Sequence, residues 1–245
     1  MLKRTVNGVI CPLHMSVQDI KENHYKVSPG FIHEDGVLPL SELLGRTITI
    51  TPTGKVHCNT CLDEYVGCAG EVCDVCCNPL LDSGNVPHVV YLSLAQSAVI
   101  GSVPVLDARE RWAALGASQV LPIARTSNAT IASEIIAKSG LRDIKGVSAA
   151  ELLSGCSEGV SLLDFENDVR NAIDGHYDAH SCAPMYASPI HYDFLKPTEV
   201  NDSEQSLDNE VTGIFIGAIG NLLLLDCGYV DLIQLSGLEV ALSLE

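Results

Sequence analysis

Aromatic side chains, basic residues and long apolar runs are all scarce in this chain of 245 residues. Phe, Trp and Tyr make up 5% of the sequence although apolar residues make up 47%, so the core has to be built mainly from Val, Ile, Leu and Ala. A chain of this length is long enough for one large domain or two small ones.

The shortage of basic residues limits the partners of the protein. There are 14 Lys and Arg against 31 Asp and Glu, which gives a net charge of −17. Such a surface repels phosphate backbones and anionic membranes unless basic groups gather in one place. Residues 85–150 hold six basic and four acidic residues, a net charge of +2, so the rest of the chain carries −19. We expect residues 85–150 to face a nucleic acid, with a protein partner as the alternative.

The lack of long apolar runs argues against a membrane protein. The longest apolar stretch, residues 213–225, has thirteen residues and includes an Asn, which is short of the roughly twenty that cross a bilayer. The apolar run near the N-terminus is too short and broken for a secretory signal. We therefore expect no membrane association and a cytoplasmic location, where thiols stay reduced.

Cysteine, by contrast, is abundant, and six of the ten cysteines lie between residues 58 and 77. Cys58 and Cys61 form one CxxC pair, Cys73 and Cys76 form a second, and eleven residues separate the pairs. This spacing is typical of a zinc ribbon, in which two tight turns bring four thiolates to one tetrahedral ion. Four protein ligands leave no open coordination position, so the zinc is expected to be structural and the function to lie elsewhere.

Other chemistries remain open for the cysteine cluster. Four thiolates also suit an iron–sulfur cluster, and a single CxxC pair suits redox chemistry. Cys68, Cys77 or His57 are alternatives to one of the four ligands. The remaining cysteines are expected to be free thiols that serve as small apolar side chains; they are Cys11, Cys156, Cys182 and Cys227.

The segment that follows the cysteines predicts the order strand, strand, helix, strand, helix. Asp107 and Glu110 have the spacing of a capping box, and Gly116 is a helix terminator. The elements are expected at residues 89–94 and 98–103 for the hairpin, from 107 to 116 for the first helix, at 119–125 for the third strand, and from Ser127 or Asn128 to about Lys138 for the second helix.

Several motifs in this chain carry a family resemblance. They are "GKVHCNTC" (54–61), "CDVC" (73–76), "HVVYL…VIG…ERWAALGASQVLPIAR" (88–125) and "VTGIFIGAIGNLLLLDCG" (211–228). Together they resemble the family called domain of unknown function 2797, which has no established activity. Within them, "VVY" (89–91) and "VIG" (99–101) look like the signature of the GIY-YIG endonuclease superfamily.

The nuclease resemblance implies roles for three residues. Tyr91 would be the first motif tyrosine, Arg111 the phosphate-binding arginine and Glu134 the single carboxylate ligand of Mg²⁺. Val99 stands where the second motif tyrosine is expected, and a valine cannot move a proton. Each residue also has a structural interpretation, namely strand packing for Tyr91, coverage of apolar surface by the Arg111 stem, and an i,i+4 pair of Glu134 with Lys138.

The sequence thus predicts an α+β fold, in which a zinc ribbon or knuckle precedes a GIY-YIG-like ββαβα unit and strands from both termini form a flanking β-rich unit. The expected function is a non-catalytic zinc-binding module that contacts a nucleic acid or a protein; the alternative is a Mg²⁺-dependent phosphodiesterase using Arg111 and Glu134. The expected segments are an N-terminal β segment (1–50), a cysteine-rich segment (51–84), the α/β domain (85–155), an acidic irregular or helical connection (156–210) and a C-terminal β-meander (211–245).

Overall fold

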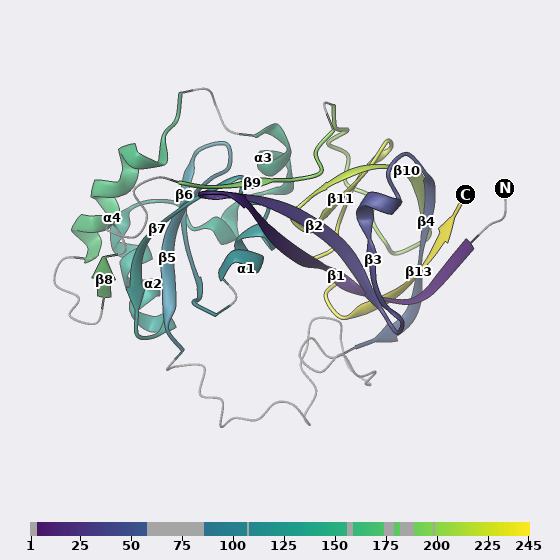
Figure 1. Cartoon of the computed structure of the whole chain (residues 1–245), viewed down its shortest axis with the longest axis horizontal. Coiled ribbons are helices and arrows are strands. Elements are labelled where there is room, and N and C mark those ends of the chain that lie inside the picture. The colour runs from purple at the N-terminus through teal and green to yellow at the C-terminus, as the bar shows by residue number, and fades with distance from the viewer. Residues whose placement is uncertain are drawn as a thin grey trace. The chain divides into compact units, whose positions relative to one another are not determined.

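The structure, a computed structural model, describes residues 4–57, 86–106, 108–155, 159–173, 179–181, 189–197 and 199–245. The chain divides into two compact units (Figure 1). We call them the terminal unit, which consists of Met1–Ser16, Val27–Pro79 and Phe194–Glu245, and the central unit, which consists of Val17–Lys26 and Leu80–Asp193. The division falls within the first two strands, so each of these strands contributes residues to both units.

The terminal unit is built from β-strands of both chain ends. Along its sheet the order is β12-β11-β10-β4-β13-β1-β2, and β3 pairs with β2. The strands are β1 (Arg4–Lys21), β2 (His24–His33), β3 (Gly36–Pro39), β4 (Thr47–Val56), β10 (Val211–Ile219), β11 (Leu222–Leu225), β12 (Gly228–Asp231) and β13 (Leu238–Leu244), with a short 3-10 helix, η1, at Leu40–Glu42.

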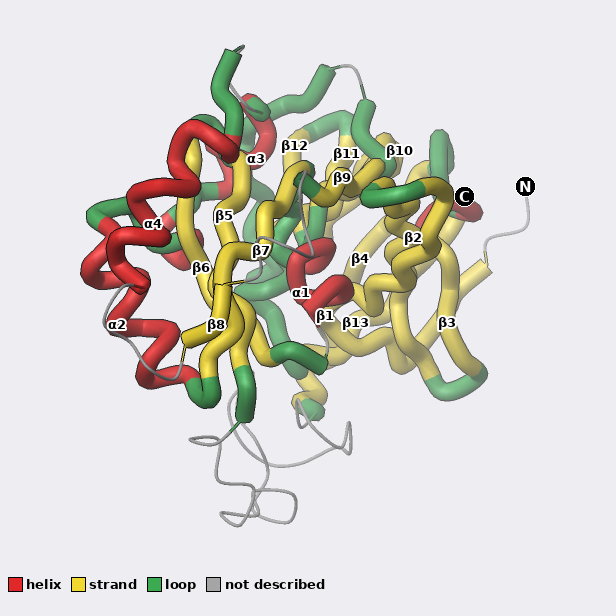
Figure 2. Tube along the Cα trace, turned by 60° about the vertical axis from the view of Figure 1, so that its left-hand side comes forward, coloured by secondary structure: helices red, strands yellow, loops and turns green. Residues whose placement is uncertain are grey.

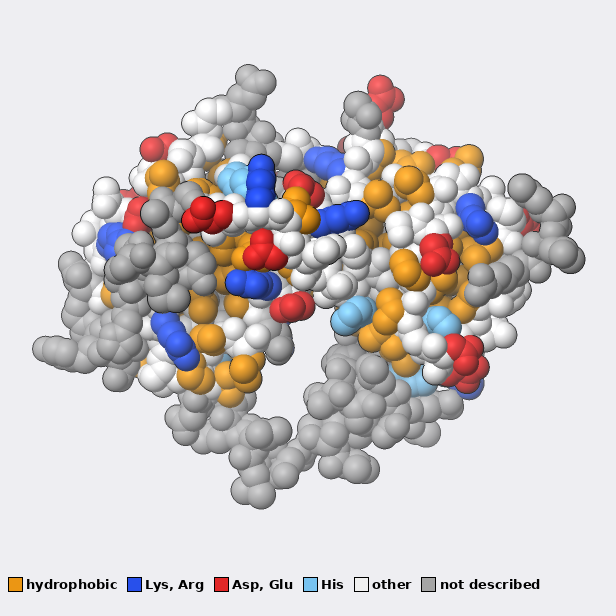
Figure 3. Space-filling model, in the orientation of Figure 1, with side chains coloured by type: hydrophobic (Ala, Val, Ile, Leu, Met, Phe, Trp, Pro, Cys, Tyr) orange, Lys and Arg blue, Asp and Glu red, His pale blue; other side chains and the backbone are white. Residues whose placement is uncertain are grey.

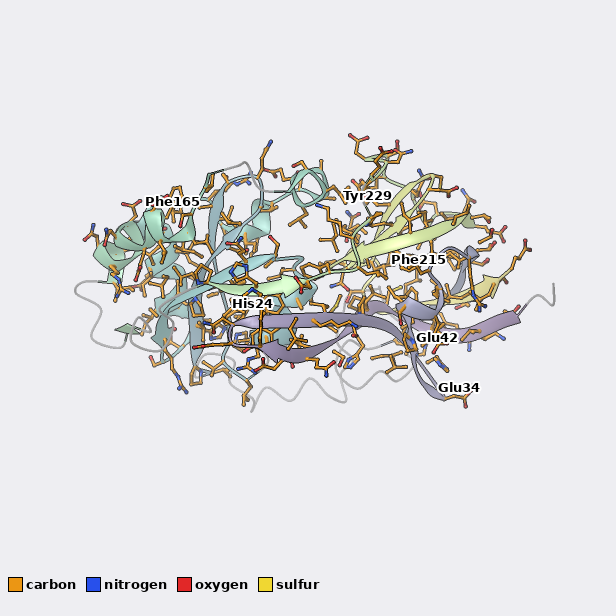
Figure 4. The ribbon with its side chains drawn as sticks, turned by 45° about the horizontal axis from the view of Figure 1, so that its top comes forward. His24, Glu34, Glu42, Phe165, Phe215 and Tyr229 are labelled. Carbon is orange, nitrogen blue, oxygen red and sulfur yellow. The ribbon has the colours of Figure 1, made fainter. Side chains whose placement is uncertain are left out.

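Alternation of apolar and polar residues explains these strands. In β10, Val211, Gly213 and Phe215 are buried while the residues between them are exposed, because successive side chains point to opposite faces of a sheet. Phe215, labelled in Figure 4, is fully buried. On the other face, the hydroxyl groups of Thr49 and Thr212 lie 2.9 Å apart across the β4–β10 pair.

β4 runs through Pro52 and Gly54, and its pairing with β13 shifts in register between Pro52 and Val56. One expectation for the terminal unit was wrong, because the C-terminal strands do not form one meander. β10, β11 and β12 pair in sequence, but β13 pairs with β4 and β1 instead.

The central unit combines a sheet with short helices. Its sheet has the order β2-β9-β7-β5-β6, and β8 also pairs with β7. In addition to the tip of the β1–β2 hairpin, its elements are β5 (His88–Leu94), β6 (Ala98–Pro104), α1 (Ala108–Ala114), β7 (Gln119–Thr126), α2 (Ala129–Ser139), η3 (Ile144–Gly146), α3 (Ala149–Ser154), η4 (Leu162–Phe165), α4 (Glu166–Ile173), β8 (Ala179–Ser181) and β9 (Ile190–Asp193).

The helices of the central unit cover both faces of the sheet. α2 and α4 lie on one side of strands β5, β6 and β7, and α1 lies on the other (Figure 2). On the first side, Leu92 and Ile100 of the strands pack with Ile135 of α2 and Val169 of α4 in one apolar cluster. On the second side, the rings of Tyr91 and Trp112 meet edge to face, with their centroids 5.5 Å apart.

The hairpin tip joins the central sheet through a short parallel pair. His24 is opposite His191 and Tyr25 is opposite Tyr192 in the β2–β9 ladder. Both pairs stack, with ring centroids 4.6 Å apart for the histidines and 5.7 Å apart for the tyrosines; His24 is labelled in Figure 4. The guanidinium of Arg109 lies 4.8 Å from the centre of the Tyr25 ring. This cation–π contact links α1 to β2.

The predicted fold class is wrong. Instead of an α+β protein with a separate GIY-YIG-like ββαβα unit, the chain forms a β-rich fold with a large mixed sheet and few helices. The elements β5, β6, α1, β7 and α2 occur in the expected order, but β9 and β8 extend the sheet beyond β7, and β2 continues it in parallel. Residues 156–210, which were expected to be an irregular or helical connection, contain β8 and β9.

The helices of the described residues are short. None of them is long and apolar enough to cross a membrane.

Candidate functional site

The centre of the candidate site is Tyr91, which lies opposite Gly101 in the β5–β6 pair. A Cβ atom added to Gly101 would lie 2.8 Å from the Tyr91 hydroxyl oxygen and 2.7 Å from Cγ2 of Ile144. Such distances are too short for real side chains, so only glycine lets the tyrosine ring cross β6 at this point. Gly101 therefore places the Tyr91 hydroxyl beside the edge of the sheet.

Two buried donors at this place have no hydrogen-bond partner among the described residues. Within the described residues, the Tyr91 hydroxyl and the Trp112 indole N–H have no hydrogen bond, although Tyr91 is fully buried and Trp112 is 3% exposed. Burial, and secondarily the negative charge of Asp143, raise the pKa of Tyr91, so its hydroxyl stays protonated. Buried polar atoms without partners are rare, and they mark places where a ligand can bind.

A cavity of about 470 Å³, which we call the β6 cavity, is lined in part by Tyr91. It has apolar walls, hydroxyl groups and three charged side chains. Its lining residues are Tyr91, Ser102, Val103, Arg111, Ala114, Leu115, Ser133, Ile136, Ala137, Asp143, Ile144 and Lys145. The volume is within the range of about 300–1,000 Å³ that is typical of small-molecule sites.

Helical spacing explains how α2 lines the β6 cavity. Ser133, Ile136 and Ala137 lie three and four residues apart and therefore share one face of the helix. Ala132 and Ile135 lie on the buried face, which packs on the sheet. The side chain of Asn128 caps the helix by accepting the N–H of Ile131 at 3.0 Å, and the helix begins at Ala129, next to the predicted start at Ser127 or Asn128.

The same spacing applies to α1 on the opposite side of the β6 cavity. Arg111, Ala114 and Leu115 line the cavity, whereas Trp112 and Ala113 are buried. Ala114 on α1, like Ser133 and Ala137 on α2, is a small residue. The cavity therefore exists because both helices place short side chains where they face it.

The charged residues of the β6 cavity come from α1 and from the turn before α3. Arg111 and Lys145 are exposed, and Asp143 is half-buried. The Asp143 carboxylate accepts the backbone N–H of Lys145 at 2.9 Å, which fixes the turn. No carboxylate in the described part of the chain pairs with Arg111 or Lys145. Both cations are therefore available to an anion in an otherwise acidic protein.

The structure separates the three predicted site residues. Tyr91 and Arg111 line the β6 cavity together, but Glu134 is exposed and is not among the lining residues. Val99, in place of the second motif tyrosine, is fully buried in β6. The carboxylate that does line the cavity belongs to Asp143.

Sequence reasoning missed Asp143 and Lys145, which belong to the segment "LRDIKG". A local signal was present. An Asp whose carboxylate accepts the backbone N–H two residues later commonly forms a turn, as Asp143 does with Lys145. The contact that brings this turn to the cavity is not local. It is a bridge between Ile100 and Asp143, with the N–H of Ile100 donated to the carbonyl of Arg142 at 3.0 Å.

The other basic residues of the predicted nucleic-acid surface do not line the β6 cavity. Arg109 lies over Tyr25, Arg142 pairs with Glu151 at 2.6 Å, and Arg125 is exposed on β7. On the face shown in Figure 3, blue and red side chains of the described residues are interspersed. Arg111 and Lys145 are therefore the two basic residues of this segment that share a cavity.

The predicted metal ligands Cys58, Cys61, Cys73 and Cys76 lie outside the described residues. So do the alternatives Cys68 and Cys77, whereas His57 is described. The Nε2 atom of His57 lies 2.8 Å from a carboxylate oxygen of Glu239, which is 7% exposed. Elsewhere in the described ranges, no group of three or more metal-ligating side chains comes together.

Two of the four cysteines expected to be thiols are described. Cys11 is buried and Cys227 half-buried, and both are free. Burial raises the pKa of Cys11 to about 12, which makes it an unreactive apolar side chain. Cys156 and Cys182 lie outside the described residues.

Comparison with known proteins gives a family but no activity. No match was found among curated proteins or among solved structures. A family model described as "Protein of unknown function (DUF2797)" matches residues 81–240, which include every residue that lines the β6 cavity. The match covers well over half of the sequence, so the chain belongs to this family of uncharacterised proteins.

Proposed function

We propose that the protein is a non-catalytic nucleic-acid-binding module, and that the β6 cavity binds a phosphate group of the nucleic acid. The observation that carries this proposal is the meeting of Arg111 and Lys145 at one cavity, without a carboxylate partner in the described structure. A guanidinium can form two parallel hydrogen bonds with a phosphate, and an ammonium adds a second positive charge.

The charge of the rest of the chain sets the expected strength of binding. The net charge of −17 repels nucleic acids at long range. With two cations at the cavity, binding should depend on salt as for about two phosphate contacts. We therefore expect local and weak binding, and a preference for flexible strands that can bring one phosphate into the cavity.

The metal-dependent phosphodiesterase is the less supported alternative. It requires Glu134 to hold Mg²⁺ near the phosphate, but Glu134 does not line the β6 cavity. It also lacks a general base at position 99, where the buried Val99 stands. Binding without cleavage is therefore the function that these residues favour.

A binding titration with a matched pair of variants tests the proposal. Fluorescence anisotropy at low salt is measured with labelled single-stranded RNA, duplex DNA and tRNA. We expect Arg111→Ala and Lys145→Ala each to weaken binding about 10-fold, as loss of a charge-assisted hydrogen bond implies. Arg125→Ala removes the same charge on β7, away from the cavity lining, and should change affinity little.

Two outcomes would contradict the proposal. The first is that none of the three nucleic acids binds at tens of micromolar protein, which would leave the protein-partner alternative. The second is an equal loss for Arg111→Ala and Arg125→Ala, which would show that binding follows the general charge of the chain and not the cavity.

We also propose one structural zinc at Cys58, Cys61, Cys73 and Cys76, on the basis of their spacing alone. Elemental mass spectrometry of the purified protein should find about one zinc per chain. Iron in place of zinc would favour the iron–sulfur alternative. The absence of both metals would rule out the four-cysteine site.

A further inference from the structure

The β6 cavity is larger and more apolar than a phosphate needs. Most of its walls are side chains without charge, among them Leu115, Ile136 and Ile144. The cationic residues Arg111 and Lys145 are exposed, whereas the Tyr91 hydroxyl is buried. The polarity of the site therefore changes from charged groups near solvent to apolar walls and one buried hydroxyl.

We propose that the β6 cavity binds one whole nucleotide, with its phosphate at Arg111 and Lys145 and its base between the apolar walls beside Tyr91. This inference rests on the nucleic-acid-binding function proposed above and names the unit that is recognised. A nucleotide has the matching polarity, because its phosphate is anionic and its base is a flat body with hydrogen-bonding edges. The nucleotide would be a strand end or an unpaired nucleotide, since a base within a duplex cannot enter a cavity.

The Asp143 carboxylate in the cavity lining favours a nucleotide over a simpler apolar anion such as a fatty acid. Asp143 lines the cavity together with Ser102 and Ser133. A fatty acid has no hydrogen-bond donor for the Asp143 carboxylate. Ribose hydroxyls and the amino groups of bases are donors that suit a carboxylate and two hydroxyl groups.

The buried hydroxyl provides a variant whose effects on folding and on binding are opposite. Tyr91→Phe removes a buried group that has no partner among the described residues, so the fold should become more stable. If the hydroxyl bonds the base, affinity for a nucleotide should fall about 5-fold, the value of one hydrogen bond. A residue with only a packing role would not show this combination.

The small residues of the helices provide a second variant. Ala114→Leu puts three more carbon atoms into the space for the base while it leaves Arg111 and Lys145 in place. We expect it to weaken nucleotide binding at least about 10-fold by loss of steric fit. Thr130→Leu places the same side chain at an exposed position on α2 outside the cavity lining, and should have no effect.

The experiment is calorimetric titration of the full chain with the four ribonucleoside 5′-monophosphates, adenosine and inorganic phosphate, followed by competition against labelled single-stranded RNA. We expect at least one monophosphate to bind about 10-fold tighter than phosphate or adenosine alone, because both ends of the ligand are held. The same monophosphate should displace the RNA, and Tyr91→Phe and Ala114→Leu should weaken it.

The outcomes separate this inference from the function on which it rests. RNA that binds but is not displaced by any monophosphate would overturn the nucleotide site and leave the nucleic-acid-binding function in place. Inorganic phosphate that binds as tightly as the best monophosphate would do the same. Absence of binding by both RNA and monophosphates would overturn both proposals.

Discussion

The two units of this protein differ in the hydrogen bonding of their buried polar groups. In the terminal unit these groups are paired: the side-chain oxygen of Asn221 accepts the N–H of Leu13 at 3.0 Å, and Glu239 is bonded to His57. In the central unit, Tyr91 and Trp112 keep buried donors that no described residue accepts. Next to them is a cavity with two cations that lack carboxylate partners in the described structure.

This difference distinguishes a unit that is stabilised from a unit that is prepared for a ligand. A paired polar group inside a protein contributes to stability, and an unpaired one is a cost that folding has to offset. The cost is understandable where a ligand later supplies the missing partner. The unpaired donors of the central unit therefore lie where the binding site is proposed.

The largest expected effect comes from removing a buried polar group in each unit. Asn221→Leu leaves the N–H of Leu13 without its acceptor, so the free energy of unfolding should fall by about 1–3 kcal/mol. Tyr91→Phe removes a buried group without a partner in the described residues, so the free energy of unfolding should rise by up to about 1–3 kcal/mol. Both are measured by urea denaturation. Equal losses in the two variants would abolish the distinction between the units.

A smaller effect is expected from adding a methyl group at Gly101, which lies opposite Tyr91 in the β5–β6 pair. Gly101→Ala adds a Cβ that meets the Tyr91 hydroxyl and Ile144, so Tyr91 has to move and stability should fall by about 1–2 kcal/mol. Trp112 is the only tryptophan of the chain and touches the Tyr91 ring, so its emission reports this movement. Gly146→Ala is the control, because a Cβ there meets no atom within 4 Å. Unchanged emission in Gly101→Ala would contradict the proposed role of this glycine.

The smallest effect concerns histidines. In the terminal unit His57 bonds a carboxylate, whereas in the central unit His191 stacks on His24. Burial and the neighbouring His24 lower the pKa of His191, with Lys21 acting in the same direction and Asp193 opposing them. The unfolded chain therefore binds a proton more readily, so the stability is present above pH 6.5 and is lost as the pH falls below 6.5 through the lower pKa of His191 in the folded protein.

The measurement is denaturant unfolding at pH 7.5 and at pH 5.5. His191→Gln should lose less stability over this interval than the original protein. His14→Gln, at an exposed position of the terminal unit, should keep the original pH dependence. A pH dependence that is the same in all three proteins would show that the stacked pair does not sense protons.

The sequence was sufficient for the elements that local patterns define. β5, β6, β7 and α2 lie close to the residues at which the sequence predicts them. It was insufficient for the partners of the strands. Whether β13 pairs with β12 or with β1, and whether β2 meets β9, depends on contacts between residues far apart in sequence, and these decided that the fold is β-rich.

The site was predictable to a similar extent. The family resemblance singled out Tyr91 and Arg111, which do line the cavity, and Glu134, which does not. Successive residues of a helix are turned by about 100°, so a shift of one position decides whether Ser133 or Glu134 faces the cavity. The bridge between Ile100 and Asp143 holds the turn that carries Lys145 beside β6. No periodic pattern in the sequence predicts such a bridge.

The most direct test of the binding site uses Trp112, which lies against Tyr91 and is the only tryptophan. Single-stranded RNA is titrated into the protein while Trp112 emission and RNA anisotropy are followed in parallel. We expect a saturable change in emission that gives the same dissociation constant as anisotropy, and we expect both signals to weaken together in Arg111→Ala. RNA binding by anisotropy without any change in Trp112 emission would place the nucleic acid away from the β6 cavity and contradict the central claim.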